Sequence, residues 1–305
     1  MISRIEHKGL KWLNLHNPTA EDIVKASKEF SLHPLVSEGL LRPSLRPRSD
    51  SYDSHLYFVL YFPLSDPDRH SLRSKEIDIV VGKNFLLTVH YDTMRPLADF
   101  FDSCDLNLAV RDQHFDNPSA LLYALWSTLY ESIYKELERI QSKVDRIEER
   151  IFIFKDNEKT LIKDISYLRR DILDFLRAVR THESVLEALR GLAPEFFGDN
   201  FLDSVRKLLS SWRRIMSLSE NNKDALETLY ETNNSFLTHR TNEIVKMFTM
   251  LALFTFPLSL IATVFSIDAA GRPIVGDPND FWIIVGILIA VIFLMYGFFK
   301  YRHWI

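Results

Sequence analysis

Met247-Phe-Thr-Met-Leu-Ala-Leu-Phe-Thr-Phe-Pro-Leu-Ser-Leu-Ile-Ala-Thr-Val-Phe-Ser-Ile267 is the stretch that decides the fold, and it contains no charged residue. A second uncharged stretch runs from Phe281 to Phe299. The hydrocarbon core of a membrane, about 30 Å thick, needs roughly 20 apolar residues of helix. The two stretches therefore predict a transmembrane hairpin. The alternative of two core helices in a soluble protein is disfavoured, because such helices rarely run this long without a charge.

Charges around the hairpin predict its orientation. Lys246 precedes the first stretch and Lys300 follows the second, whereas the connecting loop, residues 268–280, is acidic. Lys and Arg favour the cytoplasmic side of a membrane. We therefore expect a multi-pass protein of the inner (plasma) membrane with both termini cytoplasmic. The first residues lack an apolar core, so we expect no signal peptide and insertion directed by the C-terminal stretches.

Polar side chains distinguish the first stretch from a plain anchor. At about 100° per residue one stripe of the helix collects Thr249, Ala252, Phe256, Ser259, Thr263 and Ser266. Polar groups inside a membrane usually face other protein or a water-filled path. Alternatively, the hydroxyls only bond back to the carbonyl four residues earlier, and the residues leave both interpretations open. Two helices cannot enclose a path, so a path would require several copies of the chain.

Long runs without glycine or proline predict long helices before the membrane hairpin. Residues 199–256 form one such run, and a continuous helix of that length would span about 85 Å at 1.5 Å per residue and lead directly into the first apolar stretch. Residues 119–190 form another, which Lys155-Asp156-Asn157-Glu158-Lys159 divides into a helical hairpin. Gly191, Pro194 and Gly198 are expected to mark the turn between the two runs.

The N-terminal part reads as a small α/β domain. Residues 52–62 and 76–89 are rich in β-branched and aromatic residues and predict strands, with Gly82-Lys83-Asn84 as a hairpin turn. The first 45 residues alternate strand-like and helix-like pieces. We expect four parts: an α/β domain over 1–116, a helical hairpin over 117–198, a stalk helix over 199–246 and the membrane hairpin with its outer loop over 247–305.

Composition argues against several other classes of function. The net charge of −4 disfavours a nucleic-acid-binding protein. The single cysteine, Cys104, cannot form an internal disulfide. The ten histidines are scattered, and neither a catalytic triad nor a glycine-rich phosphate loop is present. The mixed charges on the helices read as solvated faces rather than a metal site, so we expect no enzyme.

Short motifs along the whole chain have the order and spacing of a known family. They are Trp12 with Pro18, Ser31-Leu32-His33-Pro34-Leu35, Arg46-Pro47-Arg48, Glu76-Ile77-Asp78, Gly82-Lys83-Asn84-Phe85-Leu86-Leu87-Thr88-Val89-His90, Asn242-Glu243-Ile244-Val245-Lys246, Phe256-Pro257-Leu258 and Lys300-Tyr301-Arg302-His303-Trp304. With them the chain resembles the CorA divalent-cation channels, the two-transmembrane magnesium transporters.

The resemblance implies a fold and a pore. The fold is an α+β cytosolic domain (an α/β/α sandwich) with long stalk helices and a two-helix transmembrane hairpin, assembled as a homopentamer whose first transmembrane helix lines the pore. The pore-lining positions it implies are Asn242, Val245, Phe248, Ala252, Phe256, Ser259, Thr263 and Ser266. An apolar girdle on this helix gates the family's pore, and Phe248 and Phe256 fall there as a hydrophobic gate.

The outer mouth departs from the family pattern. The family's Gly-Met-Asn signature is replaced here by Ser266-Ile267-Asp268. Carboxylate oxygen is a hard ligand of the kind that Mg²⁺ prefers, so a ring of Asp268 side chains would attract cations strongly and could hold them too long for fast release. Alternatively, Asp268 is a loop residue turned away from the axis.

The regulatory site implied by the family also differs. An acidic residue after the His-Pro-Leu motif helps to bind regulatory Mg²⁺ between subunits, but here Glu38 is followed by Gly39, where Asp would be expected. The partner region near Asp203 has no clear acidic match. Glu38, Asp203 and Glu231 remain as weak candidates for regulatory metal ligands.

Taken with the resemblance, these features predict a homopentameric channel for divalent cations, with Mg²⁺ first and Co²⁺ or Ni²⁺ as further ions. The partners are then other copies of the chain, the lipid bilayer and the cations. No cofactor is expected besides Mg²⁺, as the transported ion and a candidate regulatory ion. Two alternatives stay open: a Zn²⁺ transporter of the same fold, and a non-conducting membrane sensor or scaffold whose pore Phe248 and Phe256 seal.

Overall fold

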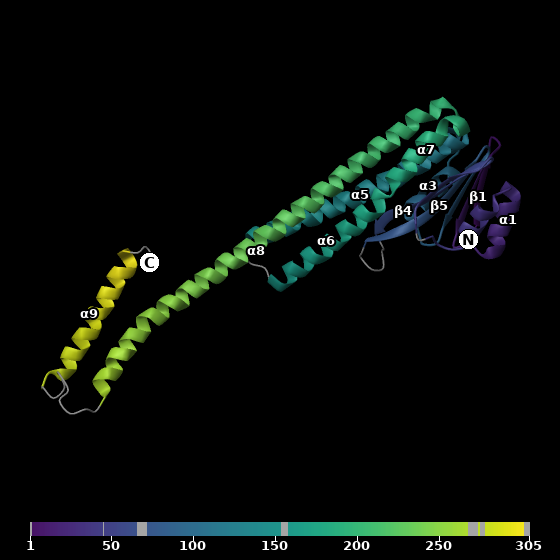
Figure 1. Ribbon diagram of the computed structural model, residues 1–305. Coiled ribbons are helices and arrows are strands. Elements are labelled where there is room, and N and C mark those ends of the chain that lie inside the picture. Colours follow the sequence, from purple (N-terminus) through teal and green to yellow (C-terminus); the bar gives the residue numbers. More distant parts are fainter. Residues whose placement is uncertain are drawn as a thin grey trace. The chain divides into compact units, whose positions relative to one another are not determined.

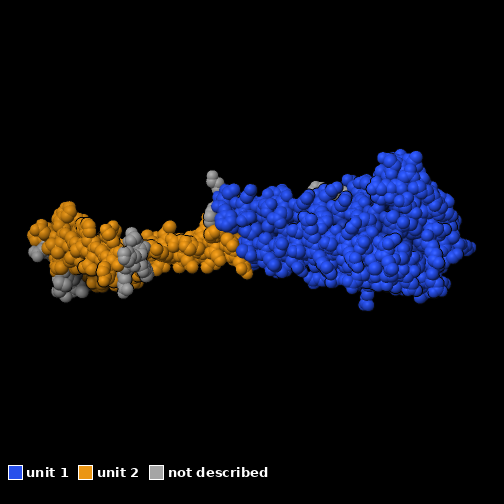
Figure 2. All heavy atoms as spheres, turned by 90° about the horizontal axis from the view of Figure 1, so that it is seen from above, with its two compact units in different colours: residues 1–230 blue, residues 231–305 orange. Residues whose placement is uncertain are grey.

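The computed structural model describes residues 2–44, 46–65, 72–153, 158–267, 274 and 278–301, without the side chains of 158, 159 and 280. Contacts divide the chain into two compact units, residues 1–230 and residues 231–305 (Figure 2). The first unit contains a sheet with helices on both faces, and the second contains two long helices (Figure 1). The division into four parts expected from the sequence stays a prediction.

A six-stranded sheet organises the first unit, in the order β1-β2-β6-β5-β4-β3. The strands are β1 (Ile2–His7), β2 (Leu10–His16), β3 (Arg48–Ser51), β4 (His55–Ser65), β5 (Leu72–Gly82) and β6 (Phe85–His90). Only the β2–β6 pairing is parallel among the described strands. The predicted Gly82-Lys83-Asn84 hairpin turn is confirmed. The strand predicted from Tyr52 instead begins at His55, because Tyr52 and His55 pair across a turn after β3, a strand that the sequence reading missed.

Helices cover the two faces of the sheet, and side-chain alternation along the strands explains why. On one face Val59 and Val80 pack with α1 (Ala20–Phe30) and α2 (Pro34–Gly39). On the other face Phe58 lies against Trp126 of α5, with ring centroids 6.2 Å apart. This face also carries α3 (Arg95–Leu106), and α4 (Leu108–His114) follows it. The predicted α/β/α sandwich is confirmed.

Over residues 117–198 the described part of the chain forms three helices, where the sequence predicted a hairpin of two. They are α5 (Pro118–Ile153), α6 (Glu158–Arg180) and α7 (His182–Phe197). The first predicted break falls at residues 154–157, outside the described residues. The second break, at Thr181, was missed. Gly191 and Pro194 lie inside α7 rather than in a turn, because burial of Leu189 and Ala193 holds that segment helical.

The predicted long helix and its continuation into the first apolar stretch are confirmed. After a 3-10 turn at Asp199–Phe201, α8 runs without interruption from Leu202 to Ser266, 65 residues. Gly198, with φ 83°, provides the left-handed conformation that turns the chain into it. The second apolar stretch forms α9 (Asp280–Tyr301), as expected.

His182 explains the missed break between α6 and α7. Its side chain is completely buried, with Nε2 donating to the Tyr61 carbonyl at 2.8 Å and Nδ1 placed 3.2 Å from the Tyr130 hydroxyl. This pattern fits a neutral ring, and burial lowers the pKa of His182 to about 4. A polar side chain with both nitrogens satisfied thus fixes the start of α7 on β4.

We predict that protonation of His182 destabilises the first unit in mild acid. The unfolded chain takes up this proton near pH 6.5 and the folded chain only near pH 4, so the free energy of unfolding falls as the pH drops between these values, by about 3 kcal/mol. In urea unfolding followed by tryptophan fluorescence, His182→Gln should lower the dependence on pH by about 1.4 kcal/mol per unit in this window. An unchanged slope in the variant would contradict the assignment.

Candidate functional site: the exposed face of α8

Two helices of the described chain are long and apolar enough to cross a membrane: α8, in its distal part, and α9. A core helix of a soluble protein is mostly buried by its own chain. In contrast, no residue in the apolar windows of α8 and α9 is buried inside this one. That exposure disfavours the alternative of two soluble core helices.

The two helices of the second unit meet along one stripe of each. In the apolar stretch of α8, residues 247–266, the half-buried residues are Met250, Phe254, Pro257, Leu258, Ile261 and Phe265. On α9 the least exposed positions include Ile284, Leu288, Val291, Met295 and Phe299. The spacing of three and four residues is that of helices packed side by side, and Phe254 and Phe299 make the contact with ring centroids 5.2 Å apart.

The predicted pore-lining residues lie on the opposite face of α8. All of them are exposed: Asn242, Val245, Phe248, Ala252, Phe256, Ser259, Thr263 and Ser266. At 100° per residue, the centre of this set lies about 170° around the helix from the centre of the set that faces α9. The two predicted gate residues are the most prominent, with Phe248 64% and Phe256 73% exposed. The chain therefore leaves uncovered the face that carries them.

Hydroxyl groups on this segment bond back to their own helix. Thr249, Thr263 and Ser266 donate to the carbonyls of Val245, Ser259 and Ala262, at 2.7, 2.8 and 2.9 Å. The second interpretation of the polar stripe, back-bonding, is thus found in the structure. It does not remove the first, because a donating hydroxyl keeps lone pairs that can accept from water or face a cation.

Thr255 provides a natural comparison within the same segment. Its hydroxyl also bonds back, to the Leu251 carbonyl at 2.9 Å, and its side chain is also exposed. However, it lies about 80° around the helix from Thr263 and from the centre of the predicted set, at the edge of the exposed face. Thr255 and Thr263 therefore share chemistry and local bonding, and differ in the direction in which they point.

The outer-mouth triplet is described only in part. Ser266 is the last residue of α8, and the Ile267 amide donates to the Val264 carbonyl at 3.3 Å. Both side chains are exposed. Asp268 lies outside the described residues, as does most of the predicted outer loop.

The three candidate ligands for a regulatory metal do not form a site within one chain. Glu38, Asp203 and Glu231 are all exposed, and Asp203 forms an ion pair with Arg206 at 2.8 Å. In the described part of the chain, no group of three or more His, Cys, Asp or Glu is arranged to hold a metal ion. A regulatory role for these residues stays a prediction that requires a second copy of the chain.

Gly39, where the family pattern places an acid, lies against a buried polar network. A Cβ at Gly39 would lie 2.9 Å from the Tyr57 hydroxyl, closer than real contacts allow. That hydroxyl donates to Asp78 Oδ1 at 3.1 Å, and Tyr57 and Asp78 are both buried. The α2 helix can hold glycine here without moving Tyr57, and a larger residue would displace it.

The network contains two buried acids that the sequence reading did not single out as functional. The hydroxyl of Tyr91 lies 3.2 Å from Asp78 Oδ2, and Glu76 accepts from the Ser44 amide at 2.7 Å. Burial raises the pKa of Glu76, and raises that of Asp78 well above its usual range. The sequence did contain a signal for these buried acids. Glu76 and Asp78 are two residues apart in an apolar strand, so both side chains point to the same buried face.

The sandwich, the long helix and two exposed apolar helices define the class of a membrane transport protein. The family model for the CorA-like Mg2+ transporter protein matches residues 7–301. The chain belongs to this family, a family of transporters and not of enzymes, and is a membrane protein with two C-terminal membrane helices.

Known transporters of this family are similar to the chain in sequence and in structure over most of their length. The cobalt/magnesium transport protein CorA of Thermotoga maritima is 23% identical over 96% of this chain and 83% of its own. The complete structure of the CorA magnesium transporter from Methanocaldococcus jannaschii matches with a TM-score of 0.83 at 18% identity, over 99% of this chain and 93% of that one. The ZntB cytoplasmic domain from Vibrio parahaemolyticus matches less well, with a TM-score of 0.54 at 14% identity, over 77% of this chain and 88% of that one.

We predict that Gly39→Ala destabilises the first unit by about 1–3 kcal/mol, because moving the Tyr57 hydroxyl leaves the buried Asp78 short of a donor. Tyr57→Phe removes the colliding atom, and the next ring carbons lie at 3.4 and 3.5 Å. In a double-mutant cycle followed by urea unfolding, the alanine should therefore cost much less in the Tyr57→Phe background. Strictly additive costs would contradict this coupling.

Proposed function

We propose that the chain forms a homopentameric channel that conducts Mg²⁺, with Co²⁺ and Ni²⁺ as further ions, along the exposed face of α8. The observation that carries the proposal is the location of the polar stripe on the face that α9 leaves uncovered. An uncovered polar face in a membrane requires further protein around it, and copies of the same chain provide it symmetrically. The number five rests on the resemblance to the CorA channels.

The choice of Mg²⁺ is supported by the ligand chemistry and by the relatives. Hydroxyl and carboxylate oxygens suit a hard cation that keeps much of its water, and the stripe provides them at Ser259, Thr263, Ser266 and, past the helix end, Asp268. The Thermotoga maritima relative is described as a cobalt/magnesium transport protein. Zn²⁺ is the second candidate, because residues 270–274 of the sequence resemble a zinc-transporting branch of the same fold.

In the proposed path, cations concentrate at the Asp268 ring on the outer side. They pass Thr263 and Ser259 as largely hydrated ions and then cross the apolar constrictions at Phe256 and Phe248. Basic Lys246 and Lys300 on one side and the acidic loop on the other support an inner-membrane protein with both termini in the cytoplasm. Entry of cations then runs down the electrochemical gradient toward the first unit.

Uptake of Mg²⁺ into liposomes, read with an internal magnesium dye, tests this proposal, with Zn²⁺ and Co²⁺ compared side by side. We expect Mg²⁺ uptake that hexaammine cobalt, a mimic of the hydrated ion, blocks. Faster uptake of Zn²⁺ than of Mg²⁺ would favour the zinc alternative. No uptake of any of these ions by a folded, oligomeric protein would favour the non-conducting sensor or scaffold.

Variants of Asp268 in the same assay test cation capture. A ring of carboxylates raises the local cation concentration, so Asp268→Ala should lower the initial rate at low Mg²⁺ about tenfold, and less so at high salt. Unchanged uptake by Asp268→Ala would contradict the capture role. A higher rate for Asp268→Asn would mean that the carboxylate holds the ion too tightly.

Thr263→Val and Thr255→Val form a matched pair of variants that tests whether ions pass along the polar stripe. Both replacements remove a back-bonded, exposed hydroxyl and keep the side-chain shape. Loss of a hydrogen-bonding group on the path should lower uptake about two- to tenfold for Thr263→Val, and the effect of Thr255→Val, at the edge of the face, should be smaller. Equal effects of the two would contradict a path along this face.

A further inference from the structure

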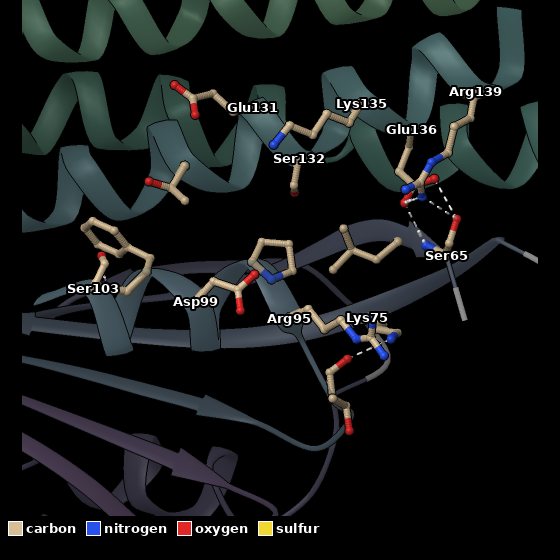
Figure 3. Close-up of a pocket in the computed structure, with 15 residues that line it drawn as sticks. Ser65, Lys75, Arg95, Asp99, Ser103, Glu131, Ser132, Lys135, Glu136 and Arg139 are labelled. Atoms are coloured by element: carbon tan, nitrogen blue, oxygen red, sulfur yellow. Dashed lines mark hydrogen bonds and ion pairs between the residues drawn. The ribbon is translucent and has the colours of Figure 1, made fainter. Parts of the chain in front are cut away.

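The first unit contains a cavity of about 620 Å³ that the proposed ion path does not use. It lies between α3, α5 and the neighbouring ends of β4 and β5 (Figure 3). Its volume falls within the usual range for small-molecule sites, about 300–1,000 Å³. Charged side chains line it from three elements, so its chemistry can be read from which of those charges already have partners.

One acidic and one basic side chain of the cavity neutralise each other. Glu136 accepts from the Ser65 amide at 3.2 Å, the Ser65 hydroxyl at 2.6 Å and Arg139 at 2.9 Å. Glu136 is only 7% exposed, so this cluster forms a closed polar wall. It therefore contributes shape and no net charge to the cavity.

Lys75 is a built-in positive charge in the same region. It is 7% exposed, and its ammonium group donates to the Thr93 carbonyl at 2.7 Å. Among the described residues, no carboxylate forms an ion pair with it. A buried ammonium group held only by a neutral carbonyl keeps its full charge available to an anion.

Four more charged side chains line the cavity, and none of them forms an ion pair with another described residue. Arg95 and Asp99 lie one turn apart on α3, and Glu131 and Lys135 lie one turn apart on α5. No hydrogen bond or ion pair joins any of the four to another described residue. Two cations and two carboxylates share one cavity, yet they remain apart.

The charges are separated along the cavity. Figure 3 shows Arg95 and Lys75 at the end near Ser65, with Asp99 and Ser103 farther along α3 and Glu131 farther along α5. Lys135 runs along α5, with its ammonium group on the side of Glu131. Leu64, Pro96 and Phe100 provide apolar surface between the polar groups. The cavity thus has a cationic end and an acidic end.

We propose that this cavity binds a phosphate-bearing small molecule, with the phosphate at Lys75 and Arg95. Two neighbouring cations suit a group with several anionic oxygens, and the planar Arg95 guanidinium can bind two of these oxygens at once. The acidic end, Asp99 and Glu131, then faces hydrogen-bond donors on the rest of the ligand, as a nucleoside would present. A divalent cation fits poorly, because the cavity offers two free carboxylates beside three cations.

Calorimetric titration of the full-length protein in detergent, in divalent-free buffer, tests the site with two probes. Inorganic pyrophosphate presents the phosphate alone, and ADP adds a nucleoside. We expect saturable binding of one molecule per chain, weakened about tenfold by Arg95→Ala. Lys83→Ala, which removes an exposed lysine from the β5–β6 turn, is the matched control and should bind as the parent does.

Glu131→Gln separates recognition from general damage to the fold. It removes a negative charge from the acidic end, so pyrophosphate should bind equally well or more tightly, whereas ADP should lose affinity. Equal affinities of the parent protein for the two probes would confine recognition to the phosphate. The proposal is overturned if neither probe binds saturably, or if Lys83→Ala weakens binding as much as Arg95→Ala does. Since the readout is binding, failure here leaves the proposed transport unaffected.

Discussion

A long apolar helix that gathers most of its polar side chains on the face that its neighbour leaves bare is more stable in a membrane when further protein or water meets that face. In α8 the covered side carries bulky apolar residues such as Phe254 and Ile261, which pack toward α9. The bare side carries Ser259 and Thr263, with Phe256 between the hydroxyl levels. Lipid tails cannot accept hydrogen bonds from these groups. In the proposed channel, assembly and the ion path are then two consequences of one asymmetry in a single helix.

The back-bonded hydroxyls fit this view. A threonine that donates to its own helix satisfies its hydrogen in a membrane without a partner, so the helix can insert before it assembles. Its oxygen still offers lone pairs to the bare face. A hydrated cation passing there would meet acceptor oxygens that are fixed in place by the helix, and such preorganised groups need little rearrangement.

The sheet of the first unit follows a different constraint, the burial of acids. Asp78 and Glu76 lie on the sheet face that α1 and α2 cover, where only tyrosine hydroxyls and backbone groups are available as partners. Tyr57 serves Asp78 and fills the space beside Gly39, so α2 cannot carry the family's acid at that position in its present location. The altered sensor sequence and the buried network are therefore linked through one hydroxyl group.

Much of this could be predicted from the sequence, because the strongest signals were local. The uncharged runs predicted both membrane helices, and the lack of glycine and proline after Gly198 predicted α8. The α/β/α sandwich was predicted from the resemblance to a known family. The break before His182 was missed because it depends on a contact with the carbonyl of Tyr61, far away in the sequence. Gly191 and Pro194 misled for the same reason, since tertiary burial overrides their helix-breaking tendency. The cavity beside Lys75 required the positions of three separate elements.

Cysteine accessibility in lipid membranes tests the central claim, a water-filled path along the bare face of α8, most directly. The chain has one native cysteine, Cys104, which is buried and can be replaced by alanine to give a silent background. Single cysteines at Ser259 and Thr263 should react with a membrane-impermeant thiol reagent and be protected by Mg²⁺. Cysteines at Ile261 and Phe265, on the α9 side, should react far more slowly. Equal reactivity on both faces, or none on the bare face of an assembled protein, would contradict a path there.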